Sequence, residues 1–190
     1  MTEKLIELLE AFDGTKATCE EDLTKSFEPI ARRVLFGGHF LINGDTRIFP
    51  LDIEFYYYND EKGKDDELND SRMYHKGRNL PYFPVLSFYP HESGVDVTFE
   101  NECLHTRASF LIRAYHYEYP DAQGDEENPR FLWEDMFGYH SFRSGGLSIR
   151  WEDDESFSVG KYEKTVRKNL NSGSGKGLVQ DKKIRRFIKK

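Results

Sequence analysis

Leu51-Asp52-Ile53-Glu54-Phe55-Tyr56 alternates between apolar and polar side chains with the period of a β-strand. One face carries Leu51, Ile53 and Phe55, and the other carries Asp52, Glu54 and Tyr56. Aromatic residues flank the stretch, so we expect both faces to be at least partly covered. A carboxylate held among aromatic rings is a candidate base, because burial and neighbouring charges tune its pKa. Glu54 is therefore the residue to explain, and the alternative is a solvated glutamate at a sheet edge.

The same alternation recurs in two strands predicted further along the chain, at residues 94–100 and 106–117. Asp96 lies on the polar face of the first, and Arg113 on the polar face of the second. If these strands neighbour the Glu54 strand in one sheet, all three side chains stand on the same side. Arg113 would then favour the ionised form of Glu54, whereas Asp96 would oppose it.

Helices are predicted before the strands, at residues 5–12 and 18–35. Thr18 with Glu21 indicates a capping box, and Pro29 would either start a fresh helix or kink the second one. Strands are predicted at residues 39–42, 46–58, 85–89, 94–100, 106–117 and 147–151. A tight turn at Asn43-Gly44-Asp45 joins the first two. The predicted fold class is α+β, with N-terminal helices followed by a mainly antiparallel, partly closed β-sheet.

Composition predicts a single domain over residues 1–190, with 37% hydrophobic and 15% aromatic residues to build a core. No run of apolar residues is long enough for a membrane span, and the charged N-terminus does not match a signal peptide, so we expect a cytoplasmic protein without a membrane partner. Cys19 and Cys103 are interpreted as structural thiols. The six histidines lack the spacing of metal ligands, and no glycine-rich phosphate loop is present, so neither a metal nor another cofactor is expected.

The formal net charge of −7 hides a division along the chain. Residues 161–190 hold eleven Lys or Arg and two acids, a charge of +9, which leaves −16 on the first 160 residues. We expect a flexible basic connection over residues 161–182 and a last short segment at 183–188. This basic end is the one obvious footprint for nucleic acid, and the alternative is a solvated tail.

At this point several short segments together resemble the alkyladenine (3-methyladenine) DNA glycosylase family, whose members flip damaged purines out of duplex DNA. The matching segments occur in family order and are Ile30 to Gly37, Asp52 to Tyr56, Tyr74 to Asn79, Tyr89 with Asp96, Ala108 to Ala114, and Lys183 to Ile188. Asp96 departs from the pattern, because the family has a neutral Asn at that place. The resemblance implies a methylpurine-DNA glycosylase-like fold and a role in base excision repair.

The resemblance also implies roles for individual residues. Glu54 would activate a water for attack on the sugar carbon, and Arg113 would help to position that water. The remaining assignments are Tyr56, His75 and Asp96 in the base pocket, Tyr89 as the residue that intercalates into DNA, and Lys182, Lys183, Arg185 and Arg186 on the DNA backbone. For Tyr89 the alternative is an ordinary core or loop aromatic.

Two other classes of function stay open at this stage. The first is a non-catalytic binding protein that keeps the fold and a polar aromatic cleft for a nucleic acid, a small ligand or a protein partner. The second is an interaction protein whose acidic segments, residues 60–70 and 152–155, mimic nucleic acid. The predicted partner in the leading interpretation is double-stranded DNA.

Overall fold

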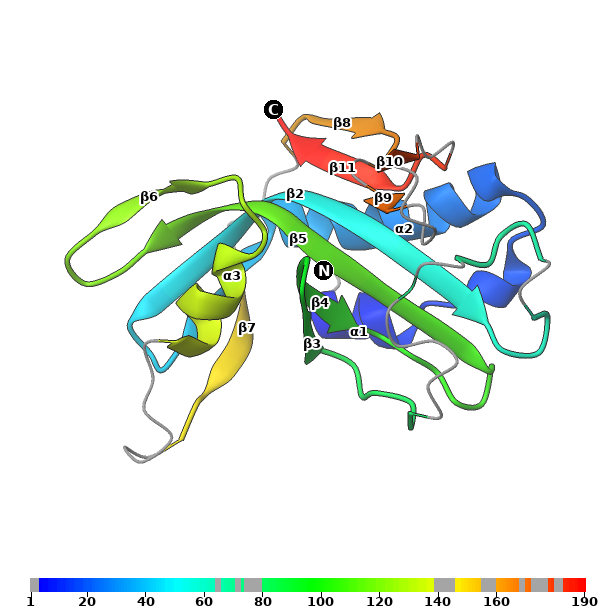
Figure 1. Ribbon diagram of the computed structural model, residues 1–190, viewed down its shortest axis with the longest axis horizontal. Helices are drawn as coiled ribbons and strands as arrows, with labels where there is room; N and C mark the ends of the chain where they lie inside the picture. Colours follow the sequence, from blue (N-terminus) through cyan, green and yellow to red (C-terminus); the bar gives the residue numbers. More distant parts are fainter. Residues whose placement is uncertain are drawn as a thin grey trace.

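The computed structural model describes residues 4–63, 66–70, 73, 80–138, 146–154, 160–167, 170–171, 178–179 and 183–190. Helical elements are α1 (Leu5–Glu10), η1 (Gly14–Lys16), α2 (Glu20–Phe36), α3 (Phe131–Trp133) and η2 (Glu134–Gly138). The strands are β1 (Gly38–Ile42), β2 (Thr46–Asn59), β3 (Ser87–His91), β4 (Gly94–Thr98), β5 (Thr106–Glu118), β6 (Gln123–Glu126), β7 (Ile149–Asp153), β8 (Tyr162–Thr165), β9 (Leu170–Asn171), β10 (Leu178–Val179) and β11 (Arg186–Lys189). Figure 1 shows the long strands β2 and β5 crossing the molecule, with α1 and α2 beside them.

Strands β2 and β5 pair along almost their whole length and form the centre of the sheet. On the edge of β2 opposite to β5, two strands follow one another. Strand β1 pairs with the first part of β2, and β11 pairs with the part that starts at Asp52. The outer edge of β5 is shared in the same way by β4 and β6. Strands β7, β3 and β8 extend β1, β4 and β11, and every pairing between the described strands is antiparallel. A small separate pair is formed by β9 and β10.

The sheet is curled but open. The register between β2 and β5 shifts on both sides of Asp52, which is the mark of a β-bulge and bends the strand. As a result Phe40 of β1 meets Phe88 of β3 edge to face, with ring centroids 5.5 Å apart, although the two strands are not hydrogen-bonded neighbours. The curl encloses part of the core.

Helix α2 covers the apolar face of β2. The Phe27 ring on the helix stacks on the Phe55 ring of β2 with centroids 4.4 Å apart, and Phe12 stacks on Phe27 at 5.2 Å. The core also takes the apolar faces of β4 and β5, among them Val97 and Phe110. Burial of these large side chains is the main favourable contribution to folding.

The structure confirms the α+β class and the antiparallel sheet, and the three alternating segments form β2, β4 and β5. The predicted capping box is wrong, because the Thr18 hydroxyl donates to Asp22 at 2.7 Å and α2 begins at Glu20. Pro29 lies inside α2, which is a single helix. Cys19 and Cys103, interpreted as structural thiols, are both free and exposed.

The segment 161–182, predicted as a flexible connection, contains strand β8, which pairs with β11, and the short strands β9 and β10. No helix in the described part of the chain is long and apolar enough to cross a membrane.

Candidate active site

One row of side chains crosses the sheet from β3 to β11. The register pairs Tyr89 with Asp96, Asp96 with Leu111, Leu111 with Glu54, and Glu54 with Arg186. Residues that face each other in antiparallel strands have their side chains on the same face of the sheet. Glu54 and Asp96 therefore share a face, as their alternation predicts, and a residue from the C-terminal segment joins them.

Glu54 is completely buried and lies between two guanidinium groups. Its Oε2 is 3.7 Å from Nη1 of Arg113, and its Oε1 is 3.8 Å from Nε of Arg186. The Tyr56 hydroxyl donates to the same Oε2 at 3.2 Å. The two guanidinium groups and the hydroxyl donor stabilise negative charge on this fully buried side chain. The site thus holds an acceptor for protons in an enclosed position.

Burial, together with the neighbouring Glu54 carboxylate, raises the pKa of the Tyr56 hydroxyl well above its ordinary value. Tyr56 therefore remains protonated and serves as a hydrogen-bond donor throughout the physiological range. The Arg167 guanidinium lies over its ring, 4.6 Å from the centroid. Arg167 also forms a buried ion pair with Asp70 and donates to the Phe55 carbonyl oxygen at 3.3 Å. Asp70 and Arg167 thus help to cover the polar face.

The ion pair between Asp52 and Arg186 is much tighter than the contact between Glu54 and Arg113. Nε of Arg186 donates to both carboxylate oxygens of Asp52, at 2.9 and 3.1 Å, and Nη2 donates to Oδ2 as well. Hydrogen bonding to Asp52 raises the pKa of Arg186 above its ordinary value. This fork-to-fork geometry fixes the position of the Arg186 guanidinium next to Glu54.

Asp96 lies at the other end of the row. Its Oδ1 is 3.3 Å from Nε2 of His91, and the Ser109 hydroxyl donates to its Oδ2 at 3.3 Å. All three side chains are buried or nearly so. The Asp96 carboxylate thus lies beside an imidazole and accepts a hydrogen bond from a hydroxyl group.

A cavity of about 370 Å³ opens beside the two arginines that flank Glu54. Its walls are formed by Leu51, Asp52, Arg113, Ala114, Asp125, Glu126, Glu127, Arg186, Ile188 and Lys189. The charged groups that line the cavity differ in exposure, because the two guanidinium groups are largely buried while the Asp125 carboxylate is mostly exposed. Among the described residues, no group of three His, Cys, Asp or Glu side chains could hold a metal ion.

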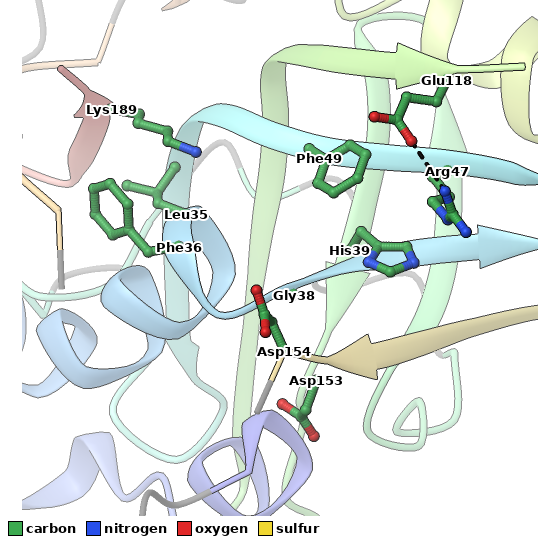
Figure 2. Close-up of a pocket in the computed structure, with 10 residues that line it drawn as sticks. All are labelled: Leu35, Phe36, Gly38, His39, Arg47, Phe49, Glu118, Asp153, Asp154 and Lys189. Atoms are coloured by element: carbon green, nitrogen blue, oxygen red, sulfur yellow. Dashed lines mark hydrogen bonds and ion pairs between the residues drawn. The ribbon is translucent and has the colours of Figure 1, made fainter. Parts of the chain in front are cut away.

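A second cavity of about 580 Å³ lies where β1 and β11 diverge along the edge of β2 (Figure 2). The His39 and Phe49 rings line it with centroids 5.0 Å apart, and burial lowers the pKa of His39. The ion pair of Arg47 with Glu118, 3.2 Å long, lies at one end of the view, and Lys189 lies at the other. Lys189 lines both cavities, so the two are neighbours.

The remaining predicted residues have mixed placements. Tyr89 is half-buried on β3, with its ring 5.5 Å from that of Phe83. Arg185 is fully buried and donates to both carboxylate oxygens of Glu20, at 2.7 and 2.6 Å. The Lys183 ammonium donates to the carbonyl oxygens of Leu68 and Asn69, and burial lowers its pKa.

A role on the DNA backbone needs exposed cationic groups, and the structure instead uses those of Arg185 and Arg186 inside the protein. His75 and Lys182 lie outside the described residues. No local pattern points to the contribution of Asp70 and Arg167, because Asp70 is the last residue of the acidic segment 60–70 and Arg167 belongs to the basic C-terminal segment.

No protein-family model, curated protein or solved structure matches this chain. The function is therefore inferred from the residues of the site and from their geometry.

Proposed function

We propose that this protein is a DNA glycosylase-like hydrolase that excises a flipped, damaged purine with a water activated by Glu54. The observation that supports the proposal is the meeting of Glu54 and Arg113 from neighbouring strands, with 3.7 Å between their charged groups, beside a cavity that Arg113 lines. A buried carboxylate with cationic neighbours next to an open cavity is a common arrangement for acid–base chemistry. The resemblance in sequence supplies the substrate class.

In the proposed reaction, the water oxygen forms a bond to the sugar carbon while the Glu54 carboxylate accepts a proton from that water. The bond between the sugar carbon and the purine nitrogen breaks, and its electron pair leaves with the base, which then takes up a proton from solvent. Positive charge develops on the sugar in the transition state, and the negative charge of Glu54 stabilises it. Arg113 and the Tyr56 hydroxyl keep the carboxylate oriented.

Release of free base from duplex DNA that contains hypoxanthine or an alkylated adenine tests this proposal. Glu54→Gln keeps the shape of the side chain but removes the proton acceptor, so we expect base release to fall by about 100-fold or more. Glu61→Gln is the matched control, because Glu61 is 69% exposed and lies outside the cavity. Equal release by the native protein and Glu54→Gln would exclude Glu54 from the chemistry.

A second function, binding without catalysis, is supported by the carboxylates of β6 at the cavity and by the internal use of Arg185 and Arg186. Both features weaken attraction for a polyanion such as DNA. This function would be supported instead if the native protein binds a ligand in the cavity but, like Glu54→Gln, releases no base.

A further inference from the structure

Arg113 has far more hydrogen-bonding capacity than the described residues use. A guanidinium group carries five N–H donors in a fixed plane. Within the ranges that the structure describes, Arg113 makes no hydrogen bond, and its ion pair is the 3.7 Å contact with Glu54. Its side chain is only 14% exposed, so bulk water reaches little of it. A mostly buried guanidinium with unused donors requires an acceptor that the described residues do not provide.

Arg186 shows the same deficit at one nitrogen. Nε and Nη2 are both committed to Asp52, whereas Nη1 is buried and has no hydrogen-bond partner among the described residues. The side chain is 9% exposed, and its ion pair with Asp52 holds it in place. An unsatisfied donor therefore lies on a group that the ion pair with Asp52 already holds in a fixed position beside the cavity.

Both arginines line the 370 Å³ cavity, and Lys189 adds a third cation to its wall. The carboxylates that share the cavity are already engaged or lie at its exposed side. Asp52 is ion-paired with Arg186, and the Asp125 carboxylate lies 2.7 Å from the His116 imidazole. The Glu126 carboxylate accepts a hydrogen bond from the Asn128 backbone N–H at 2.7 Å. The two guanidinium groups, with Asp52, thus form the buried part of the cavity, and Lys189 and the acids of β6 lie at its more exposed side.

We propose that this cavity is an oxyanion subsite that binds one phosphate group of the substrate nucleotide. The inference rests on the proposed function for the identity of the rest of the ligand. A phosphate suits the paired guanidinium groups, because its oxygens accept the forked N–H donors of arginine. Both arginines are also within 4 Å of Glu54, so a phosphate held by them brings the attached sugar close to the proposed base. The acidic rim favours a single phosphate over a polyanion that runs through the cavity.

Isothermal titration with inorganic phosphate tests the subsite on the native protein, which cannot turn this probe over. Arg113→Gln is the decisive variant, since Arg113 makes no hydrogen bond among the described residues and the protein is expected to fold without it. We expect at least a tenfold loss of phosphate affinity. Lys189→Ala, at an exposed position, gives an independent and smaller loss. Arg150→Gln is the control, because Arg150 is 58% exposed and outside the cavity.

Glu54→Gln then allows the nucleotide to be tested without turnover, with a purine nucleoside, its 5′-monophosphate and a short 5′-phosphorylated oligonucleotide as probes. We expect both phosphorylated probes to bind at least ten times more tightly than the nucleoside. Tighter binding of the oligonucleotide identifies DNA as the source of the phosphate, and tighter binding of the monophosphate identifies a free nucleotide. Equal affinities for nucleoside and monophosphate, or unchanged phosphate binding in Arg113→Gln, would overturn the subsite.

The two proposals fail in different ways. Phosphate binding that depends on Arg113, in a protein that releases no base, leaves the subsite in place and refutes the glycosylase reaction. Base release that depends on Glu54, in a protein that does not bind phosphate, supports the glycosylase reaction and refutes the phosphate subsite.

Discussion

At residues 52–55 both faces of β2 are hidden from water, but one face carries apolar side chains and the other carries charged ones. Ile53 and Phe55 on one face and Glu54 on the other are all 0% exposed, and Asp52 is 6% exposed. Burying the apolar face is favourable in itself, whereas burying carboxylates and guanidinium groups carries a desolvation cost that their attraction only partly offsets. The difference teaches that one face serves stability, and that the charged face is where a function should be sought.

The strongest way to test the apolar face is Phe55→Ala. The Phe55 ring contacts the rings of Phe27 and Phe187, at 4.4 and 5.5 Å between centroids, so the change leaves a large cavity in the core. We expect the free energy of unfolding to fall by about 4 kcal/mol. Urea denaturation measures it, with the milder Phe55→Leu as control. A loss below about 1 kcal/mol, outside the range for such truncations, would mean that this face is not the core.

Asp52→Asn tests the charged face by opening its tightest ion pair. The Arg186 guanidinium would remain buried without its negative partner, so we expect a loss of about 3 kcal/mol. Replacing both residues together, as Asp52→Leu with Arg186→Met, should restore most of that stability, because no charge is then left unpaired. Denaturation of the single and double variants forms the measurement. If the double variant is as unstable as the single one, the pair contributes net stability and the contrast between the two faces is weaker than stated.

Much of the fold could be predicted from the sequence, because alternation within a strand is a local property. The segments 46–58, 94–100 and 106–117 needed no partner to reveal that each has two faces. The same reasoning put Glu54 and Asp96 on one side, as their register confirms.

Neighbours in space that are distant in sequence could not be predicted in this way. Arg186 and Asp52 are 134 positions apart, and no periodicity within either strand says that β11 fills the edge of β2 beside β1. The cluster of basic residues at the end of the chain was interpreted as a surface footprint because charge is usually exposed. Arg185 and Arg186 are the exception, since each is buried with a carboxylate partner, a half-buried Glu20 for Arg185 and a buried Asp52 for Arg186.

His39 is a titrating group at the edge of the buried region. We expect its substitution to change stability less than the two changes on β2. Burial lowers the pKa of His39 below its ordinary 6.5, and the carboxylate of Glu152, 3.5 Å away, only partly opposes this shift. Above pH 6.5 the imidazole is neutral in the folded and the unfolded chain, so its contribution to stability is fully present. As the pH falls from 6.5 towards the lowered pKa, the unfolded chain takes up a proton that the folded chain does not, and stability is lost.

His39→Gln should therefore flatten the dependence of stability on pH in that window. Thermal denaturation at a series of pH values between about 7.5 and 5 measures the effect, since the ordinary pKa of histidine lies inside this range. His105→Gln is the control, because His105 is 49% exposed. If the native protein and His39→Gln lose stability in parallel on acidification, His39 is not desolvated. In that case desolvation would affect the ion-paired groups around Glu54 but not the imidazole of His39.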